Sequence, residues 1–92
     1  VDEHRLATEV LFYVERSAIT EEIVRFKSHL DQFQSTLSAT GSIGRKLDFI
    51  TQELHREINT IASKTADLSI SQYIVDVKTE IEKIREQVQN IE

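Results

Sequence analysis

Apolar residues recur in alternating four- and three-residue steps along two long segments of this chain. One segment begins at Ile19 and ends at Leu37, and the other begins at Ile70 and ends at Ile91. Their apolar members are Ile19, Ile23, Phe26, Leu30, Phe33 and Leu37, then Ile70, Ile74, Val77, Ile81, Ile84, Val88 and Ile91. This spacing places the side chains on one side of an α-helix, in a seam typical of coiled coils. We therefore predict a long amphipathic helix over each segment.

The first of these helices is expected to begin much earlier, because Leu6, Val10 and Tyr13 form a helical line of their own. The phase of the pattern shifts at Ser17–Thr20. Such a shift fits either a break in which Thr20 caps a new helix or a stutter within one long helix. We favour a near-continuous helix from Val1 to Leu37.

A third helical pattern occupies the middle of the chain, from about Ile43 to Ile61. The preceding Ser38–Ser42 is rich in small polar residues, and we expect Gly41 to be the left-handed residue that ends the first helix. The last helix carries a capping-box signature beginning at Ser69, although an earlier start with Asp67 as the cap is also compatible with the sequence.

The composition supports an all-α protein. The 92 residues contain no proline, no cysteine and two glycines, and 29% of them are charged. Such a short chain buries a thin core, so we expect one domain over residues 1–92 with three antiparallel helices in a coiled-coil-like bundle or hairpin. We also expect self-association through the apolar seams. The sequence has no apolar run long enough to cross a membrane, and the absence of cysteine suits the reducing cytoplasm.

The middle helix breaks its own apolar pattern at one position. Ile43, Leu47, Ile50 and Leu54 predict another apolar residue at position 57, where the sequence has Glu57. A carboxylate at the edge of an apolar seam is costly unless it has a partner or a metal ion. This conflict marks position 57 as a candidate functional position.

Four side chains, including that of Glu57, could converge if the first two helices are antiparallel neighbours. Glu53 precedes Glu57 by one turn, while His29 flanks the seam of the first helix and Glu22 lies two turns before it. Carboxylates with one imidazole form a ligand set expected for Mg²⁺ or Mn²⁺ rather than structural zinc. The alternative is that the glutamates form ordinary ion pairs with Arg or Lys and that the histidine packs. The sequence contains no motif for an organic cofactor.

The net charge of −5 is not the usual footprint of a nucleic-acid-binding protein. Local basic residues are nevertheless present, since Arg45 and Lys46 follow Gly44 at the start of a predicted helix, where free N–H groups also favour a phosphate. Arg56 and Lys64 extend the cationic surface along that helix. Arg45 and Lys46 could equally pair with acidic residues of a neighbouring chain, and composition does not decide between these alternatives.

The ordered motifs of the chain closely resemble the C-terminal region of the YicC/YloC family. The matching segments are Glu21-Glu22, Arg25, Ser28-His29-Leu30, Gly44-Arg45-Lys46-Leu47-Asp48-Phe49, Gln52-Glu53, Arg56-Glu57, Asn59-Thr60, Ser63-Lys64 and the ending from Glu82 to Glu92. The resemblance implies the C-terminal domain of a longer, cytoplasmic, bacterial protein whose N-terminal domain is absent here. Family members are described as stress-associated, metal-dependent endoribonucleases that bind RNA and form oligomers.

The resemblance also implies roles for matching residues. Glu53, Glu57 and His29 become candidates for catalysis and metal binding, and Glu22 becomes a further candidate ligand. Arg45, Lys46, Arg56 and Lys64 become candidates for RNA contact. The alternative hypothesis is a non-catalytic helical module that drives oligomerisation. A ligand cluster should gather Glu53, Glu57 and His29 within about 5 Å, whereas a scaffold should pair each of them with Arg or Lys.

Overall fold

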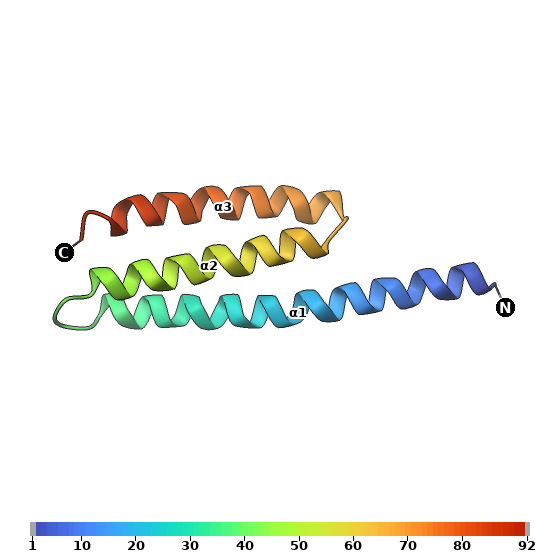
Figure 1. Cartoon of the computed structure of the whole chain (residues 1–92), viewed down its shortest axis with the longest axis horizontal. Helices are drawn as coiled ribbons and strands as arrows, with labels where there is room; N and C mark the ends of the chain where they lie inside the picture. The colour runs from blue at the N-terminus through green and yellow to red at the C-terminus, as the bar shows by residue number, and fades with distance from the viewer. Residues whose placement is uncertain (1, 92) are drawn as a thin grey trace.

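The computed structural model describes residues 2–91 and consists of three α-helices. Helix α1 spans Glu3–Leu37, α2 spans Gly44–Lys64 and α3 spans Leu68–Val88. Consecutive helices run antiparallel and are joined by short loops (Figure 1). The predicted all-α class with three long helices is therefore confirmed. The predicted start of the first helix at Val1 lies outside the described residues.

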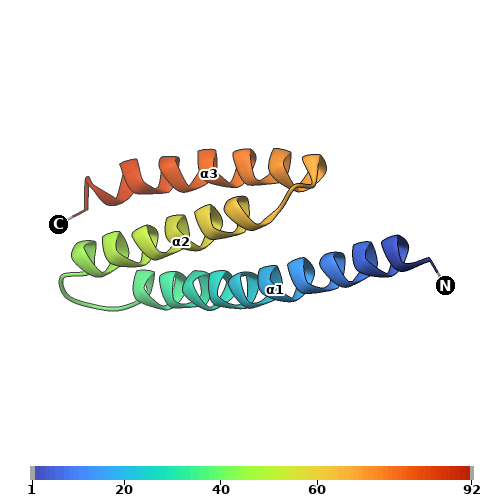
Figure 2. The same cartoon turned by 45° about the vertical axis from the view of Figure 1, so that its right-hand side comes forward.

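The three helices lie side by side in a single layer rather than around a common axis. Helix α2 lies in the middle and packs against both α1 and α3, whereas within residues 2–91 no Cα atom of α1 lies within 8 Å of one in α3. Two views of the molecule show this arrangement (Figures 1 and 2). The overall dimensions of 62 × 20 × 14 Å match such an elongated, flat layer. The architecture is thus a helical hairpin extended by a third antiparallel helix.

The core is centred on α2 because this helix has a neighbour on each side. Leu47, Ile50, Leu54, Ile58 and Ile61 of α2 are all buried. From the flanking helices, Ile19 of α1 and Ile74 and Ile81 of α3 complete the buried cluster. Helix α2 therefore needs a wider apolar surface than either of its neighbours.

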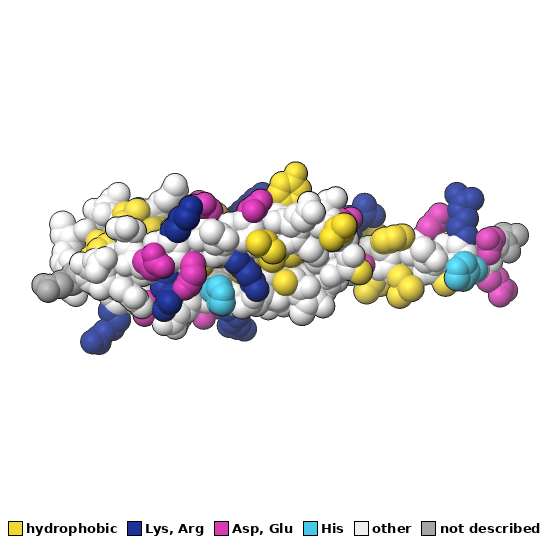
Figure 3. All heavy atoms as spheres, turned by 90° about the horizontal axis from the view of Figure 1, so that it is seen from above, with side chains coloured by type: hydrophobic (Ala, Val, Ile, Leu, Met, Phe, Trp, Pro, Cys, Tyr) yellow, Lys and Arg dark blue, Asp and Glu magenta, His cyan; other side chains and the backbone are white. Residues whose placement is uncertain are grey.

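The apolar seam of α1 is only half covered. Ile19, Phe26 and Phe33 pack against the core, whereas Ile23, Leu30 and Leu37 are 39% to 51% exposed. The first turns of α1 also extend past α2 and α3 (Figure 1), and this end of the helix carries exposed apolar side chains such as Leu6 and Val10 (Figure 3). One face of α1 consequently has no packing partner among residues 2–91.

The helix ends differ in detail from the sequence predictions. Helix α1 runs unbroken through Ser17–Thr20 and ends with Ser38 as its C-cap. Gly41 lies further on in the loop, where its φ of 93° does place it in the left-handed region, so its predicted role as the cap is wrong. Asp67 caps α3, because its Oδ1 accepts hydrogen bonds from the N–H groups of Ser69 and Ile70. The alternative start at Asp67 is thus the correct one.

The loop between α2 and α3 is tied to α1. The backbone N–H of Ala66 donates a hydrogen bond of 3.2 Å to Oε1 of Glu15. This contact helps to set the position at which α3 turns back along α2. Over residues 2–91, no helix combines the length and apolar character needed to cross a bilayer.

Candidate metal and ion-pair site

The antiparallel pairing of α1 and α2 brings together three of the side chains singled out in the sequence. One ligand atom each from His29, Glu53 and Glu57 lies within 4.8 Å of the other two. His29 projects from α1, while Glu53 and Glu57 are one turn apart on α2. The expected convergence of these residues is therefore present in the fold.

Burial makes this cluster chemically unusual. Glu57 is only 4% exposed, and His29 and Glu53 are half-buried. The Nδ1 atom of His29 is buried and has no hydrogen-bond partner among the described residues. Buried polar atoms are almost always hydrogen-bonded, so an unpartnered ring nitrogen beside two carboxylates indicates a position that accepts a further group.

A second set of contacts surrounds the cluster. The Nε of Arg25 lies 3.1 Å from each carboxylate oxygen of Glu57, and its Nη2 contacts Oε2 of Glu22. Lys64 at the end of α2 completes this set, with its Nζ 3.1 Å from Oε1 of Glu22. The four residues form an ion-pair network across the interface between α1 and α2.

The network strongly favours the charged form of Glu22, which is itself 4% exposed. Contact with the neighbouring Glu57 carboxyl group and with the Arg25 and Lys64 cations lowers the pKa of Glu22 from 4.5 to about 2. The same two glutamates raise the pKa of Arg25 above its usual value, because both stabilise the charged guanidinium. Glu22 therefore anchors two cations instead of joining the ligand cluster.

The structure meets the criterion for a metal site and only part of the criterion for a scaffold, because His29 forms no ion pair with Arg or Lys among residues 2–91. His29, Glu53 and Glu57 do gather within 5 Å, yet Glu57 pairs with Arg25 and Glu53 pairs with Arg56 at 3.3 Å. The two interpretations are therefore not exclusive in this fold.

The residues present fit a divalent cation. Two oxygens at about 2.1 Å from an octahedral Mg²⁺ lie roughly 3.0 to 4.2 Å apart. The ligand atoms of His29, Glu53 and Glu57 lie within 4.8 Å of one another, close to this range. The two glutamates offer oxygen ligands, and the imidazole of His29 offers a nitrogen ligand.

The predicted RNA-contact residues lie in two different environments. Arg45 and Lys46 are exposed at the start of α2, and neither makes an ion pair with another described side chain. Arg56 is largely exposed but contacts Glu53, and Lys64 contacts Glu22. Of these four residues, only Arg45 and Lys46 have no ion-pair partner among residues 2–91.

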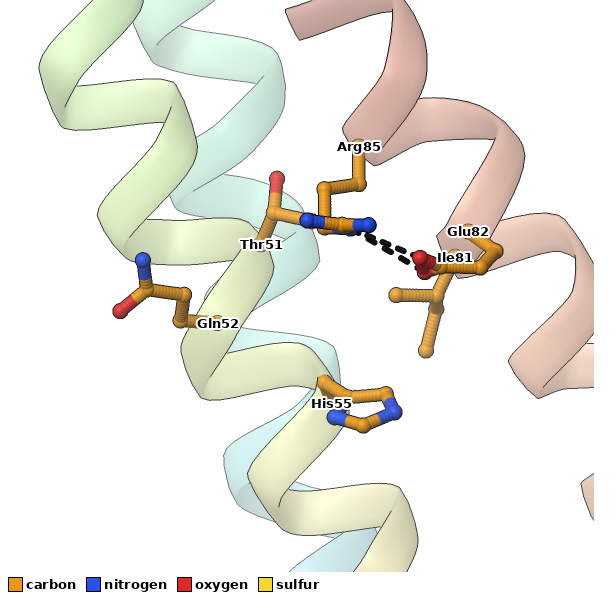
Figure 4. Close-up of a pocket in the computed structure, with 6 residues that line it drawn as sticks. All are labelled: Thr51, Gln52, His55, Ile81, Glu82 and Arg85. Atoms are coloured by element: carbon orange, nitrogen blue, oxygen red, sulfur yellow. Dashed lines mark hydrogen bonds and ion pairs between the residues drawn. The ribbon is translucent and has the colours of Figure 1, made fainter. Parts of the chain in front are cut away.

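His55 lies on a different side of α2 from the candidate metal ligands. It lines a shallow pocket of about 300 Å³ between α2 and α3, together with Thr51, Gln52, Ile81, Glu82 and Arg85 (Figure 4). The Glu82 carboxylate already holds Arg85 there, at 2.7 Å. His55 therefore does not belong to the cluster formed by His29, Glu53 and Glu57.

Arg25 is the central residue of this ion-pair network. It is also the one member of the network to which the sequence pattern assigned no role in the site. It contacts one of the three candidate ligands directly and contacts Glu22 on its own helix. The spacing of the residues could have predicted its position, because Arg25 follows Glu22 by three residues and precedes His29 by four. These steps place all three on one side of a helix.

Comparison with known proteins defines the class to which this helical layer and its site belong. Residues 1–92 match the family described as Endoribonuclease YicC-like, C-terminal. The chain therefore belongs to the YicC-like C-terminal family, as the motif resemblance indicated.

Two curated relatives align over the whole chain. It is 59% identical to the "Probable endoribonuclease YicC" of Clostridioides difficile (strain 630) and 40% identical to the protein of the same name from Haemophilus influenzae. All 92 residues align in both cases, and they span 31% and 32% of the relatives' lengths. The chain thus corresponds to about a third of each relative.

Proposed function

We propose that this chain is the C-terminal domain of a longer metal-dependent endoribonuclease and that His29, Glu53 and Glu57 hold its divalent cation. The observation that carries the proposal is the convergence of these three side chains, one of which, His29, has a buried ring nitrogen without a hydrogen-bond partner among the described residues. The names of the two relatives support RNA as the substrate. The absence of cysteine suits work in the reducing cytoplasm.

The donor set supports Mn²⁺ or Mg²⁺, because two carboxylates and one imidazole suit such ions. A bound ion of this kind would polarise a phosphodiester and lower the pKa of a water molecule. The chain's own contribution is to hold two glutamates and a histidine together on two packed helices. Packing of α1 on α2 limits their motion, so little entropy is lost when they close on an ion.

RNA contact is proposed for the basic residues near this site. Arg45 and Lys46 stand at the start of α2, where the N-cap residue Ile43 makes no side-chain hydrogen bond to the free N–H groups. Positive side chains and free N–H groups together favour phosphate. Arg56 and Lys64 would join only by weakening their contacts with Glu53 and Glu22.

The experiment measures Mn²⁺ binding and RNA cleavage by the full-length protein and by its Glu53→Gln and Glu57→Gln variants. Glu80→Gln is the matched control, because Glu80 is an exposed glutamate paired with Lys83 on α3, a helix that carries none of the three candidate ligands. We expect the first two variants to lose ion binding and cleavage while keeping their helical content and assembly. Unchanged cleavage in either folded variant would exclude that glutamate from the catalytic site.

A second candidate function is a helical oligomerisation module with no catalytic role. The uncovered half of the α1 seam favours it, since Ile23, Leu30 and Leu37 recur every seven residues on an exposed face. A repeat of this kind is suited to packing against another helix. Such assembly is also compatible with the catalytic proposal.

Sedimentation of full-length Leu30→Glu, beside Val24→Glu, would test this self-association. Val24 is also exposed but lies about 100° around the helix from Ile23. If the seam mediates assembly, Leu30→Glu should lower the oligomer order and Val24→Glu should not. Equal assembly of both variants and the wild type would count against the seam.

A further inference from the structure

We propose that Arg25 is a built-in cation that occupies Glu57 in the metal-free protein and is displaced from it when a divalent ion binds. The inference rests on the proposed metal site and adds a residue that competes with the ion for one of its ligands. It begins from the position of the Arg25 guanidinium, whose Nε reaches both oxygens of Glu57.

Glu57 cannot serve both cations fully at once. Its two oxygens each lie 3.1 Å from Arg25 Nε, so the carboxylate is oriented toward α1 and the guanidinium. An ion shared with His29 and Glu53 would take up a Glu57 oxygen that Arg25 now contacts, and the positive charges of the ion and the guanidinium would repel one another. Ion binding therefore weakens the Arg25–Glu57 contact.

The fold supplies a place for Arg25 after this exchange. Nη2 of Arg25 contacts Glu22, which is not one of the three clustered ligands. Glu22 is buried and anchored by Lys64 from the other helix. Arg25 can thus leave Glu57 while remaining tethered to Glu22, with its half-exposed side chain turned toward solvent (48% exposed).

Competition of this kind has a clear role in a buried site. The carboxylates of Glu22, Glu53 and Glu57 lie close together and would repel one another without a cation. Arg25 supplies that charge while no ion is bound, so the interface between α1 and α2 stays folded. Because binding linkage is reciprocal, whatever stabilises the Arg25–Glu57 pair must weaken ion binding by the same factor.

Removal of Arg25 should therefore strengthen ion binding. We expect full-length Arg25→Met to bind Mn²⁺ at least about fivefold more tightly than the wild type, measured by calorimetry. Arg25→Lys should lie between the two, because an ammonium group keeps the charge but lacks the guanidinium fork. Arg25→Lys also keeps the proposal testable if Arg25→Met fails to fold.

Lys64→Met is the matched control for charge. It removes the same single charge from the network, but its contact is with Glu22 and not with His29, Glu53 or Glu57. We expect its Mn²⁺ affinity to rise by less than that of Arg25→Met, because Lys64 does not compete with the ion for an oxygen of the three clustered ligands.

A measurement on the unmodified protein completes the test. In the ¹H–¹⁵N spectrum, the Arg25 Nε–H signal should shift when Mg²⁺ saturates the site, because its hydrogen bonds to Glu57 are lost. An unchanged signal at saturation, or weaker Mn²⁺ binding by both folded Arg25 variants, would overturn the competition while leaving the metal site standing. Absence of Mn²⁺ binding by the wild type as well would overturn the proposed site itself.

Discussion

The ammonium group of Lys64, the last residue of α2, lies 3.1 Å from the buried Glu22 carboxylate of α1. Arg25 contacts the same carboxylate from one turn further along α1. Glu22 therefore links the C-terminal end of α2 to the middle of α1 through two cations. These contacts stabilise the helix interface only while Glu22 is ionised.

The first prediction concerns the dependence of stability on pH. The pKa of Glu22 is about 2 in the folded protein and 4.5 for an ordinary glutamate, so the unfolded chain takes up the proton first as pH falls. The stabilisation from Glu22 should be complete above about pH 5 and decline as pH falls towards 2. Urea unfolding of wild type and Glu22→Gln across this range would measure it.

The difference in unfolding free energy between these two proteins should be largest near neutral pH and disappear at about pH 2. Glu80→Gln is again the control, because that exposed carboxylate forms only a surface pair with Lys83. A pH-independent difference for Glu22→Gln would show that ionisation of Glu22 does not drive the effect.

The second prediction concerns the centre of α2. Leu54 is 1% exposed and packs in the core between the flanking helices. Leu54→Ala should reduce the free energy of unfolding by about 2 to 5 kcal/mol, because it removes buried apolar surface and leaves a cavity. Phe49→Ala on the same helix should change it by less than about 1 kcal/mol, since Phe49 is 61% exposed. Equal losses in chemical denaturation would contradict the central position of Leu54.

The third prediction distinguishes the two caps considered for α3. Asp67→Ala should destabilise the protein by about 0.5 to 2 kcal/mol, because Asp67 Oδ1 accepts the hydrogen bonds of two N–H groups at the start of the helix. Ser69→Ala should have little effect, since Ser69 participates in the cap through its backbone N–H. Thermal unfolding followed by circular dichroism would compare them, and a larger loss for Ser69→Ala would place the cap at Ser69.

The fourth prediction concerns the loop between α1 and α2. A Cβ at Gly41 would meet nothing within 4 Å, so any cost of substitution comes from its φ of 93°. Gly41→Ala should lower stability by about 1 kcal/mol, and Gly41→Asn should cost less, because asparagine tolerates left-handed backbone better. Indistinguishable unfolding curves for Gly41→Ala and the wild type would mean that the loop relaxes to another conformation.

The sequence determined the helices and most of their limits. Alternating steps of four and three residues from Ile19 and from Ile70 can satisfy only helical geometry, and the structure confirms α1 and α3 there. Glu57 also stood out by itself, because a carboxylate in an apolar line requires a partner wherever the helix packs.

Tertiary structure alone decided how those helices share their apolar surface. The seams of α1 and α3 look alike in sequence, yet Ile81 is buried and Leu30 is exposed. The reason is that α2 covers only one side of each flanking helix within the described residues, so the orientation of each helix against α2 decides which residues of its seam are buried. Periodicity identifies an apolar face but not the neighbour that covers it.

The sequence alone also could not predict which charged residues pair with one another. Arg25 and Glu57 are 32 positions apart, and Lys64 and Glu22 are 42 apart, so no local rule pairs them. Their contacts depend on the register with which α2 folds back along α1. That register is set by the packing of buried side chains across the interface, and it brings His29 to Glu53 and Glu57 while placing Arg25 on Glu57.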